Sequence, residues 1–560
     1  MRWLLAGCVA CVMGVASAAV AAPVFKITLD GKVATAPVSG RVVVMLITPT
    51  AKLPAGTSPM DAPFWEDIQP LGGADVRALA PGAATVIDEK AEWIGGVPAD
   101  FPAGEYQAAA VFIADRTDYG KTSSWRNDAG NYFSEVTTFT LPADAAARAA
   151  AIIDISLSKQ TKGKLPAAGD GVEFVEVPSK LLSDFHKTPV VLRAGVVKPR
   201  VMAEGQKYAA IYEVPGFGGR HDGANRVARD RKRAATGVAA QLADSTFYIV
   251  LDPESPNGHT LFADSANNGP WGAALTTELI PALEKRFALE PRAEARLLRG
   301  HSSGGWSTVW LQLMYPGVFG ATWSTAPDPI DFRGFQRVDI YGGGNFYDVG
   351  PDFKPFNELE AAFAKDHGYP SYRRGRDPAT VKPIMGVRQE VSGENMFGPR
   401  FTSGKQWASW LAVWGTRDVA DARRPAPLFD PATGVINAKI VEQYRKYDIG
   451  HLTRTSPEKY LPIWDGRIRL VCGSLDNFYL NQAVELVKAD LEKLRPAVGA
   501  AAPAGAGYVK LVANLDHSSI SGSAEVRAFP QEMADHLIAN GLLAQPAPAA
   551  EKPEAVKESK

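Results

Sequence analysis

The chain has 560 residues, of which 46% are hydrophobic and 22% are charged, and its formal net charge is −1. This balance is typical of a globular protein and excludes a chain that is disordered throughout. Because the charge is nearly balanced, we expect no nucleic-acid partner. At roughly 150 residues per domain, the length allows three or four structural units.

The first eighteen residues have the order of a secretory signal peptide. Arg2 precedes an apolar run that extends to about Val15, and residues 16–18 have the small side chains Ala-Ser-Ala. Signal peptidase cleaves after such residues, so we expect a cut after Ala18 and a periplasmic or secreted mature protein.

Two of the three cysteines, Cys8 and Cys11, would leave with this signal peptide. Residues 5–8 resemble the cleavage site of bacterial lipoproteins, in which the cysteine is lipidated. Only seven residues precede Cys8, however, too few for an apolar region before the cut. The mature chain then keeps only Cys472 and forms no internal disulfide. Later segments stay below the roughly 18 apolar residues of a spanning helix, so no membrane span is expected.

Residues 19–145 contain short β-type runs, such as Val24–Leu29 and Arg41–Ile47, which are separated by Gly, Pro and Asp clusters. This spacing predicts an antiparallel β-sandwich-like domain. The segment is too short for a β-propeller, because each blade needs about 40–45 residues. Residues 146–206 are interpreted as a connecting segment.

Residues 207–544 alternate between short apolar strands and helical patterns, which predicts an α/β domain with a mostly parallel sheet. The alternation lapses over 332–462, which we interpret as an insertion. Residues 545–560 are rich in Ala, Pro, Glu and Lys and are expected to form a disordered tail. The expected strands are 208–214, 246–251, 295–298, 321–324, 467–471 and 508–512, and the expected helices are 270–287, 304–314 and 481–494.

The sequence Gly-His-Ser-Ser-Gly-Gly over 300–305 lies between an expected strand and an expected helix. A nucleophilic serine on such a strained turn needs small residues two positions before and two positions after it, because the backbones approach closely there. The N-terminus of the following helix also favours a developing negative charge. Ser302 is therefore the predicted nucleophile.

A serine needs a base and an orienting carboxylate, and in this fold they follow in the order serine, acid, histidine. His517 follows the last expected strand and is the predicted base. His451 and His536 are the other late histidines, and His536 lies within a helical pattern.

Asp476 follows the strand 467–471 and is the predicted acid, although it could instead cap the next helix. Asp328 and Asp331 follow the strand after the nucleophile, a position that some hydrolases also use, and Asp516 is adjacent to the base. These alternatives stay open.

The oxyanion hole needs two backbone N–H groups. Ser303, directly after the nucleophile, supplies the first. The second is expected from Phe217 or Gly218, in the Pro-Gly-Phe-Gly-Gly sequence over 215–219, because its glycines allow the backbone to face a ligand.

Candidate substrate-binding residues are His301 and Trp306 beside the nucleophile, and Trp271 in the segment 264–271. Tryptophans such as Trp306 and Trp410 could form sugar-stacking walls or pack in the core. The His, Cys and carboxylate residues lack zinc-site spacing, so we expect no metal and no cofactor.

Four of these segments together resemble the putative-esterase family, which includes esterase D, enterochelin esterases and feruloyl or acetyl-xylan esterases. They are 215–219, 264–271, the helix that contains 278–284, and the serine turn at 302. The resemblance implies an α/β-hydrolase fold. The N-terminal all-β domain and the insertion are predicted from the sequence pattern instead, and the insertion departs from the family. The resemblance also implies the roles of nucleophile, acid and base for Ser302, Asp476 and His517. The long gap before Asp476 departs from the family pattern.

These observations predict an exported serine esterase that acts on a small-molecule or polysaccharide-linked ester. An exported serine peptidase and a non-catalytic hydrolase-fold binding protein are the alternatives. The sequence does not determine the oligomeric state.

Overall fold

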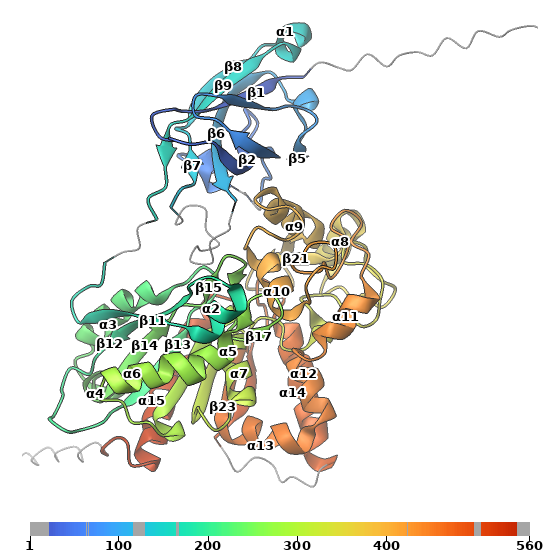
Figure 1. Cartoon of the computed structure of the whole chain (residues 1–560). Helices are drawn as coiled ribbons and strands as arrows, with labels where there is room; N and C mark the ends of the chain where they lie inside the picture. Colours follow the sequence, from blue (N-terminus) through green and yellow to red (C-terminus); the bar gives the residue numbers. More distant parts are fainter. Residues whose placement is uncertain are drawn as a thin grey trace, which may run out of the picture. The chain divides into compact units, whose positions relative to one another are not determined.

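The structure is a computed structural model that describes residues 22–62, 64, 66–115, 129–163, 167–422, 424–497 and 506–545. The signal peptide predicted at 1–18, and the predicted tail after residue 545, lie outside these residues. The chain forms two compact units (Figure 1), one made of residues up to Phe112 together with Tyr132–Lys159, and one made of Ile113–Asn131 and the chain from Gln160 onward. Within the described residues, no helix is both long and apolar enough to cross a membrane.

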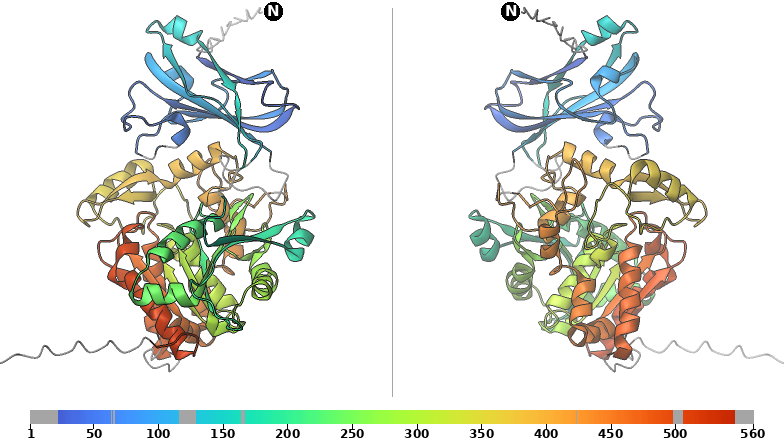
Figure 2. Two further views of the ribbon diagram at one scale, coloured as in Figure 1. Left: turned by 90° about the vertical axis from the view of Figure 1, so that its left-hand side faces the viewer. Right: turned by 90° about the vertical axis from the view of Figure 1, so that its right-hand side faces the viewer.

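The N-terminal unit consists of two β-sheets (Figure 2). Phe25 of one sheet is fully buried, and its ring lies 5.8 Å from Trp93 and 6.0 Å from Phe139 of the other sheet. The two sheets therefore share an apolar core between them, as in a β-sandwich. The smaller sheet has the order β4 (Ala84–Ile87), β1 (Val24–Leu29), β9 (Ile152–Leu157), and the larger contains β2 (Val38–Ile47), β3 (Leu71–Leu79), β5 (Glu92–Ile94), β6 (Gly104–Ala114), β7 (Tyr132–Phe133), β8 (Thr137–Leu141) and β10 (Lys159–Gln160).

The segment predicted to be a connector, 146–206, instead contributes strands to both units. Strand β9 pairs in parallel with β1, and its side chains alternate between exposed and buried positions, which inserts Ile153 and Ile155 into the N-terminal core. Strands β11 (Val172–Pro178) and β12 (Val191–Val197) form an antiparallel hairpin at one edge of the second sheet. The prediction failed because half-buried edge strands give only a weak sequence signal.

The second unit is built on an eight-stranded sheet with the order β11-β12-β14-β13-β19-β20-β23-β24. Strand β12 pairs antiparallel with its neighbours, and the six strands from β14 to β24 are parallel to one another. This order and the helical crossovers confirm the predicted α/β-hydrolase fold. The parallel strands are β13 (Ala209–Val214), β14 (Thr246–Leu251), β19 (Arg296–His301), β20 (Ala321–Thr325), β23 (Ile468–Gly473) and β24 (Tyr508–Val512).

Helices cover both faces of this sheet, because successive side chains of a buried strand point to opposite faces. Ile211 of β13 packs in one core with helices α3, α4, α14 and α15. Its neighbour Tyr212 packs in a second core with α2, α5 and α6 on the other face. These helices are α2 (Lys180–His186), α3 (Ala224–Arg233), α4 (Gly237–Ser245), α5 (Trp271–Ala274), α6 (Ile280–Arg286), α14 (Asn481–Ala497) and α15 (Ala524–Ala539).

The insertion lies between β20 and β23 and is mainly helical. It is compact, since Trp407 and Trp414 are fully buried in the same core as the main sheet. Its elements are α8 (Glu358–His367), the hairpin β21 (Pro370–Arg374) and β22 (Lys382–Gly386), α9 (Val387–Met396), α10 (Gln406–Trp414), α11 (Ala438–Tyr444), α12 (Ile449–Thr455) and α13 (Pro457–Arg467).

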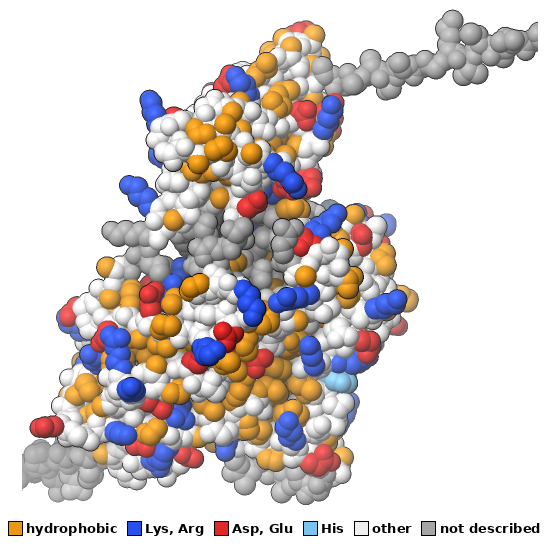
Figure 3. All heavy atoms as spheres, viewed as in Figure 1, with side chains coloured by type: hydrophobic (Ala, Val, Ile, Leu, Met, Phe, Trp, Pro, Cys, Tyr) orange, Lys and Arg blue, Asp and Glu red, His pale blue; other side chains and the backbone are white. Residues whose placement is uncertain are grey.

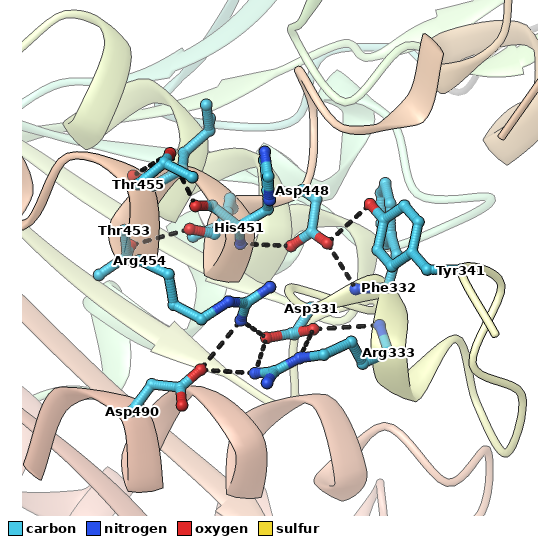
Figure 4. Close-up of polar contacts among 12 residues, drawn as sticks. Asp331, Phe332, Arg333, Tyr341, Asp448, His451, Thr453, Arg454, Thr455 and Asp490 are labelled. Atoms are coloured by element: carbon cyan, nitrogen blue, oxygen red, sulfur yellow. Dashed lines mark hydrogen bonds and ion pairs between the residues drawn. The ribbon is translucent and has the colours of Figure 1, made fainter. Parts of the chain in front are cut away.

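On the face shown in Figure 3, side chains of both charges are interspersed. One ionic cluster ties the insertion to the hydrolase fold (Figure 4). The fully buried carboxylate of Asp331 accepts from Arg333 at 2.7 Å and also from Arg454 of α12. Asp490 of α14 binds the same two guanidinium groups, Arg454 at 2.9 Å. The start and the end of the insertion are thus tied to one helix of the hydrolase fold.

Candidate active site

Ser302 occupies the sharp turn between strand β19 and helix α7 (Ser303–Met314). Its backbone has φ 58° and ψ −128°, a strained conformation for a residue with a side chain. A Cβ on Gly300 would lie 2.1 Å from the carbonyl oxygen of Gly304, and a Cβ on Gly304 would lie 1.9 Å from that of Val214. The turn that raises Ser302 at the end of the sheet therefore requires glycine at both positions.

His517 and Asp476 lie in loops that follow neighbouring strands, β24 and β23. Their side chains form a hydrogen bond of 2.7 Å between His517 Nδ1 and Asp476 Oδ2, and both are buried. The second oxygen, Asp476 Oδ1, accepts from the backbone N–H of Phe478 at 2.9 Å. Gly473 permits the close approach of the two loops, since a Cβ there would lie 2.2 Å from the carbonyl oxygen of Leu515.

The His517 ring lies 4.6 Å from the ring of His301, the residue directly before Ser302. Within the described residues, the Ser302 hydroxyl itself has no hydrogen-bond partner. Catalytic hydrogen bonds are often long in a substrate-free site and shorten when substrate binds, so this geometry is compatible with a serine–histidine pair.

The two histidines differ in pKa. Burial lowers the pKa of His517, but the carboxylates of Asp476, Asp328 and Asp516, with Asp476 the largest contributor, together more than offset burial, so the pKa is raised overall. Burial, together with the neighbouring His517, lowers the pKa of His301 to about 4. His301 is thus neutral at pH 7, whereas His517 beside its carboxylate is poised to accept a proton.

The other candidate acids have different partners. Asp328 accepts from Ser303 Oγ at 2.7 Å and from Trp410 Nε1 at 2.6 Å. Asp331 belongs to the ionic cluster described above, and Asp516 accepts from Arg376 at 3.1 Å and from backbone amides of its own loop. Of these four carboxylates, only Asp476 is hydrogen bonded to the His517 ring.

Residues 215–219 form a tight turn beside Ser302, closed by a 2.9 Å hydrogen bond from Gly219 N–H to the Gly216 carbonyl. Gly218 has φ +77°, and a Cβ on Gly216 would lie 3.3 Å from Ser302 Cβ. The N–H groups of Phe217 and Gly218 have no acceptor among the described residues. The turn therefore presents free donors near the serine, as an oxyanion hole requires.

The structure does not support a substrate-binding role for the two tryptophans. Trp306 is fully buried and stacks on Trp310 at 5.1 Å, and Trp271 is buried against Phe262 at 5.8 Å. Both rings pack in the cores on the two faces of the sheet. Trp410, considered for sugar stacking, is buried as well.

His301 lines a cavity of about 560 Å³ beside the serine turn. Gly216, Ser521, Arg226 and Arg299 line the same cavity. His301 Nδ1 is buried and unpartnered within the described residues.

The insertion contributes site residues that sequence reasoning missed. The buried Arg373 of β21 donates to the backbone carbonyl oxygens of Asp476 at 3.0 Å and of Ser474 at 3.1 Å. Tyr372 packs on Phe478, whose ring in turn lies 5.1 Å from that of His517. These residues belong to no motif. In the sequence, only the alternating residue types of a short hairpin could have indicated them.

Among the described residues, no group of three or more His, Cys, Asp or Glu side chains is placed to hold a metal ion. The chemistry available at the site is that of a serine, an imidazole, a carboxylate and backbone donors.

The sheet order and the serine turn define an α/β hydrolase. Residues 193–426 match the family described as putative esterase. The matched segment lies in the second compact unit, contains Ser302 and ends before Asp476 and His517.

A search of curated proteins finds no match. Solved structures similar to this chain include FphF of Staphylococcus aureus, a fluorophosphonate-binding serine hydrolase (10% identity, 66% of this chain, 99% of that chain, TM-score 0.34). Another is an S-formylglutathione hydrolase from Agrobacterium tumefaciens (13% identity, 66% of this chain, 96% of that chain, TM-score 0.33). A third is a ferulic acid esterase from Anaeromyces mucronatus (12% identity, 67% of this chain, 93% of that chain, TM-score 0.29). These values are too low to transfer an activity to this chain.

Proposed function

We propose that the protein is a serine esterase that hydrolyses carboxylic esters through an acyl-enzyme on Ser302. The observation that carries this proposal is the 2.7 Å bond between His517 and Asp476, which orients the imidazole at the end of the sheet where the strained serine turn lies. The esterase family match supports the class of reaction.

In the proposed mechanism, Ser302 Oγ forms a bond to the ester carbonyl carbon while its proton moves to His517 Nε2. Asp476 stabilises the imidazolium, and the carbonyl oxygen becomes an oxyanion that accepts from Ser303 N–H and from Phe217 or Gly218 N–H. When the intermediate collapses, the bond to the alcohol oxygen breaks and His517 protonates the departing alcohol. Each oxyanion donor is expected to contribute ~10²–10³ in rate.

Water then repeats the sequence on the acyl-enzyme. His517 removes a proton from water as its oxygen attacks the acyl carbon, and the proton returns to Ser302 as the acid is released. We propose a small-molecule or polysaccharide-linked ester as substrate.

Labelling with a fluorophosphonate probe tests the nucleophile. We expect one adduct per chain, located by mass spectrometry on the peptide that contains Ser302, and turnover of 4-nitrophenyl acetate. Ser302→Ala should abolish both, whereas the matched control Ser518→Ala, which removes an exposed hydroxyl beside His517, should retain both. Labelling of another residue, or activity above a few per cent of wild type in Ser302→Ala, would contradict the assignment.

The same preparation separates the alternatives. A serine peptidase would cleave peptide substrates that an esterase leaves intact, and a binding protein would cleave neither peptides nor esters and stay unlabelled.

Export is a separate proposal that rests on the sequence of residues 1–18. N-terminal sequencing of protein recovered from the periplasm or medium should begin near Ala19. A chain that begins at Met1, or at a lipidated Cys8, would contradict it.

A further inference from the structure

Helix α10 of the insertion makes hydrogen bonds that lead to both sides of the proposed oxyanion hole. Gln406, Ser409 and Trp410 are spaced i, i+3 and i+4, so they lie on one face of the helix. None of the three belongs to the sheet of the hydrolase fold, and no motif marks them.

On one side, the contacts lead to Ser303. Trp410 Nε1 donates to Asp328 Oδ2 at 2.6 Å, and Gln406 Nε2 lies 3.2 Å from the same oxygen and 3.3 Å from Ser303 Oγ. Ser303 Oγ in turn donates to Asp328 at 2.7 Å. Because Asp328 is buried, its partners fix its position, and through it the first residue of α7, whose N–H is one proposed donor.

On the other side, the contacts lead to the turn at 215–219 through His259, which is fully buried. His259 Nδ1 accepts from the backbone N–H of Leu261 at 3.0 Å, so the ring proton is on Nε2. His259 Nε2 therefore donates to the carbonyl oxygen of Pro215, 2.9 Å away. Burial lowers the pKa of His259 to about 4, which keeps this neutral tautomer at pH 7.

This hydrogen bond orients the turn, because the peptide bond between Pro215 and Gly216 is planar. His259 is held by α10 in turn: its backbone N–H donates to Ser409 Oγ at 3.1 Å. The contact is close, since a Cβ on Gly258 would lie 2.0 Å from Ser409 Oγ.

We propose that helix α10 positions the two donors of the oxyanion hole, with Ser409 acting through His259 on the turn at 215–219 and with Trp410 acting through Asp328 on Ser303. The proposal rests on the proposed function. The insertion would then be part of the catalytic apparatus, and its residues on α10 would be positioning residues that touch no substrate.

Two pairs of variants test this. Trp410→Phe removes the N–H that Asp328 accepts, and its matched control Trp414→Phe removes an indole N–H that is buried and unpartnered within the described residues. Ser409→Ala removes the acceptor of the His259 N–H, and its control Ser403→Ala removes an acceptor used only within the insertion.

For Trp410→Phe and Ser409→Ala, we expect kcat for 4-nitrophenyl acetate to fall about tenfold or more with KM within about twofold. This loss is smaller than the ~10²–10³ for deletion of a donor. The inhibition constant of a trifluoromethyl ketone, whose adduct carries the oxyanion, should rise by the same factor. The controls should keep both values within about twofold, even where melting temperatures fall equally.

If each variant matches its control in kcat and inhibitor affinity, α10 is only structural and the proposal is wrong. A wild-type protein that neither hydrolyses the ester nor reacts with a fluorophosphonate would overturn the proposed function, and this inference with it.

Discussion

Replacing Asp476 by Asn removes the charge that holds His517 while changing the shape of the site little. Asp476 Oδ1 accepts from the backbone N–H of Phe478 at 2.9 Å and faces that of Leu480 at 3.4 Å. The oxygen of the new amide must keep this position as an acceptor, so its NH2 group faces His517 Nδ1. The imidazole is then driven to the tautomer with its proton on Nε2, which cannot accept a proton from Ser302.

We expect Asp476→Asn to lower kcat by up to ~10⁴, the loss associated with the wrong tautomer in such triads. This factor corresponds to about 5 kcal/mol of transition-state stabilisation. Because the Asp476 charge raises the pKa of His517, its loss should also move the acidic limb of residual kcat/KM to lower pH.

The assay is ester hydrolysis from pH 5 to 9, with circular dichroism to verify folding. The matched control is Asp516→Asn, in which the carboxylate bound to Arg376 and to its own loop is neutralised beside the same histidine. The control should stay within about threefold of wild type, as expected for a partly exposed ion pair. Near-wild-type activity of Asp476→Asn, or an equal loss in the control, would refute the assignment of the acid.

Three further predictions concern the scaffold. Gly304→Ala should abolish activity, because its Cβ would lie 1.9 Å from a backbone oxygen of β13, whereas Gly317→Ala, with open space around it, should be active in the same assay. Burial raises the pKa of Glu390 to about 7. The carboxyl ionises more readily in the unfolded chain than in the folded protein, so the free energy of unfolding falls as pH rises from about 4.5 through about 7. Glu390→Gln should therefore gain in melting temperature relative to wild type at pH 8.5 compared with pH 5.5, and an unchanged difference would contradict the buried acid. Arg454→Met should lower the free energy of unfolding in urea by about 2 kcal/mol, since charged hydrogen bonds of the cluster in Figure 4 are lost; no loss would mean that the cluster does not fasten the insertion.

The sequence by itself determined the features that a few contiguous residues specify. The turn around Ser302 was predictable because backbone approach demands glycine at 300 and 304, whatever the rest of the chain does. The alternation of strands and helices predicted the hydrolase sheet in the same way, since buried strands are continuous apolar runs.

Only the tertiary structure decided which side chains meet. The sequence favoured Asp476 as the acid but left Asp328, Asp331 and Asp516 open, and the pairing of β23 with β24 is what puts Asp476 beside His517. Trp306 could have been a substrate wall, but the packing of α7 on the sheet buries it.

The contacts of the turn at 215–219 with His259, and of His259 with α10, could likewise not be predicted from the sequence, because these segments are far apart in the chain. Contacts of this kind depend on how whole elements pack, and no local pattern encodes them. The candidate residues of the site could therefore be predicted from short motifs, whereas the contact between the candidate acid and base and the positions of the supporting residues required the fold.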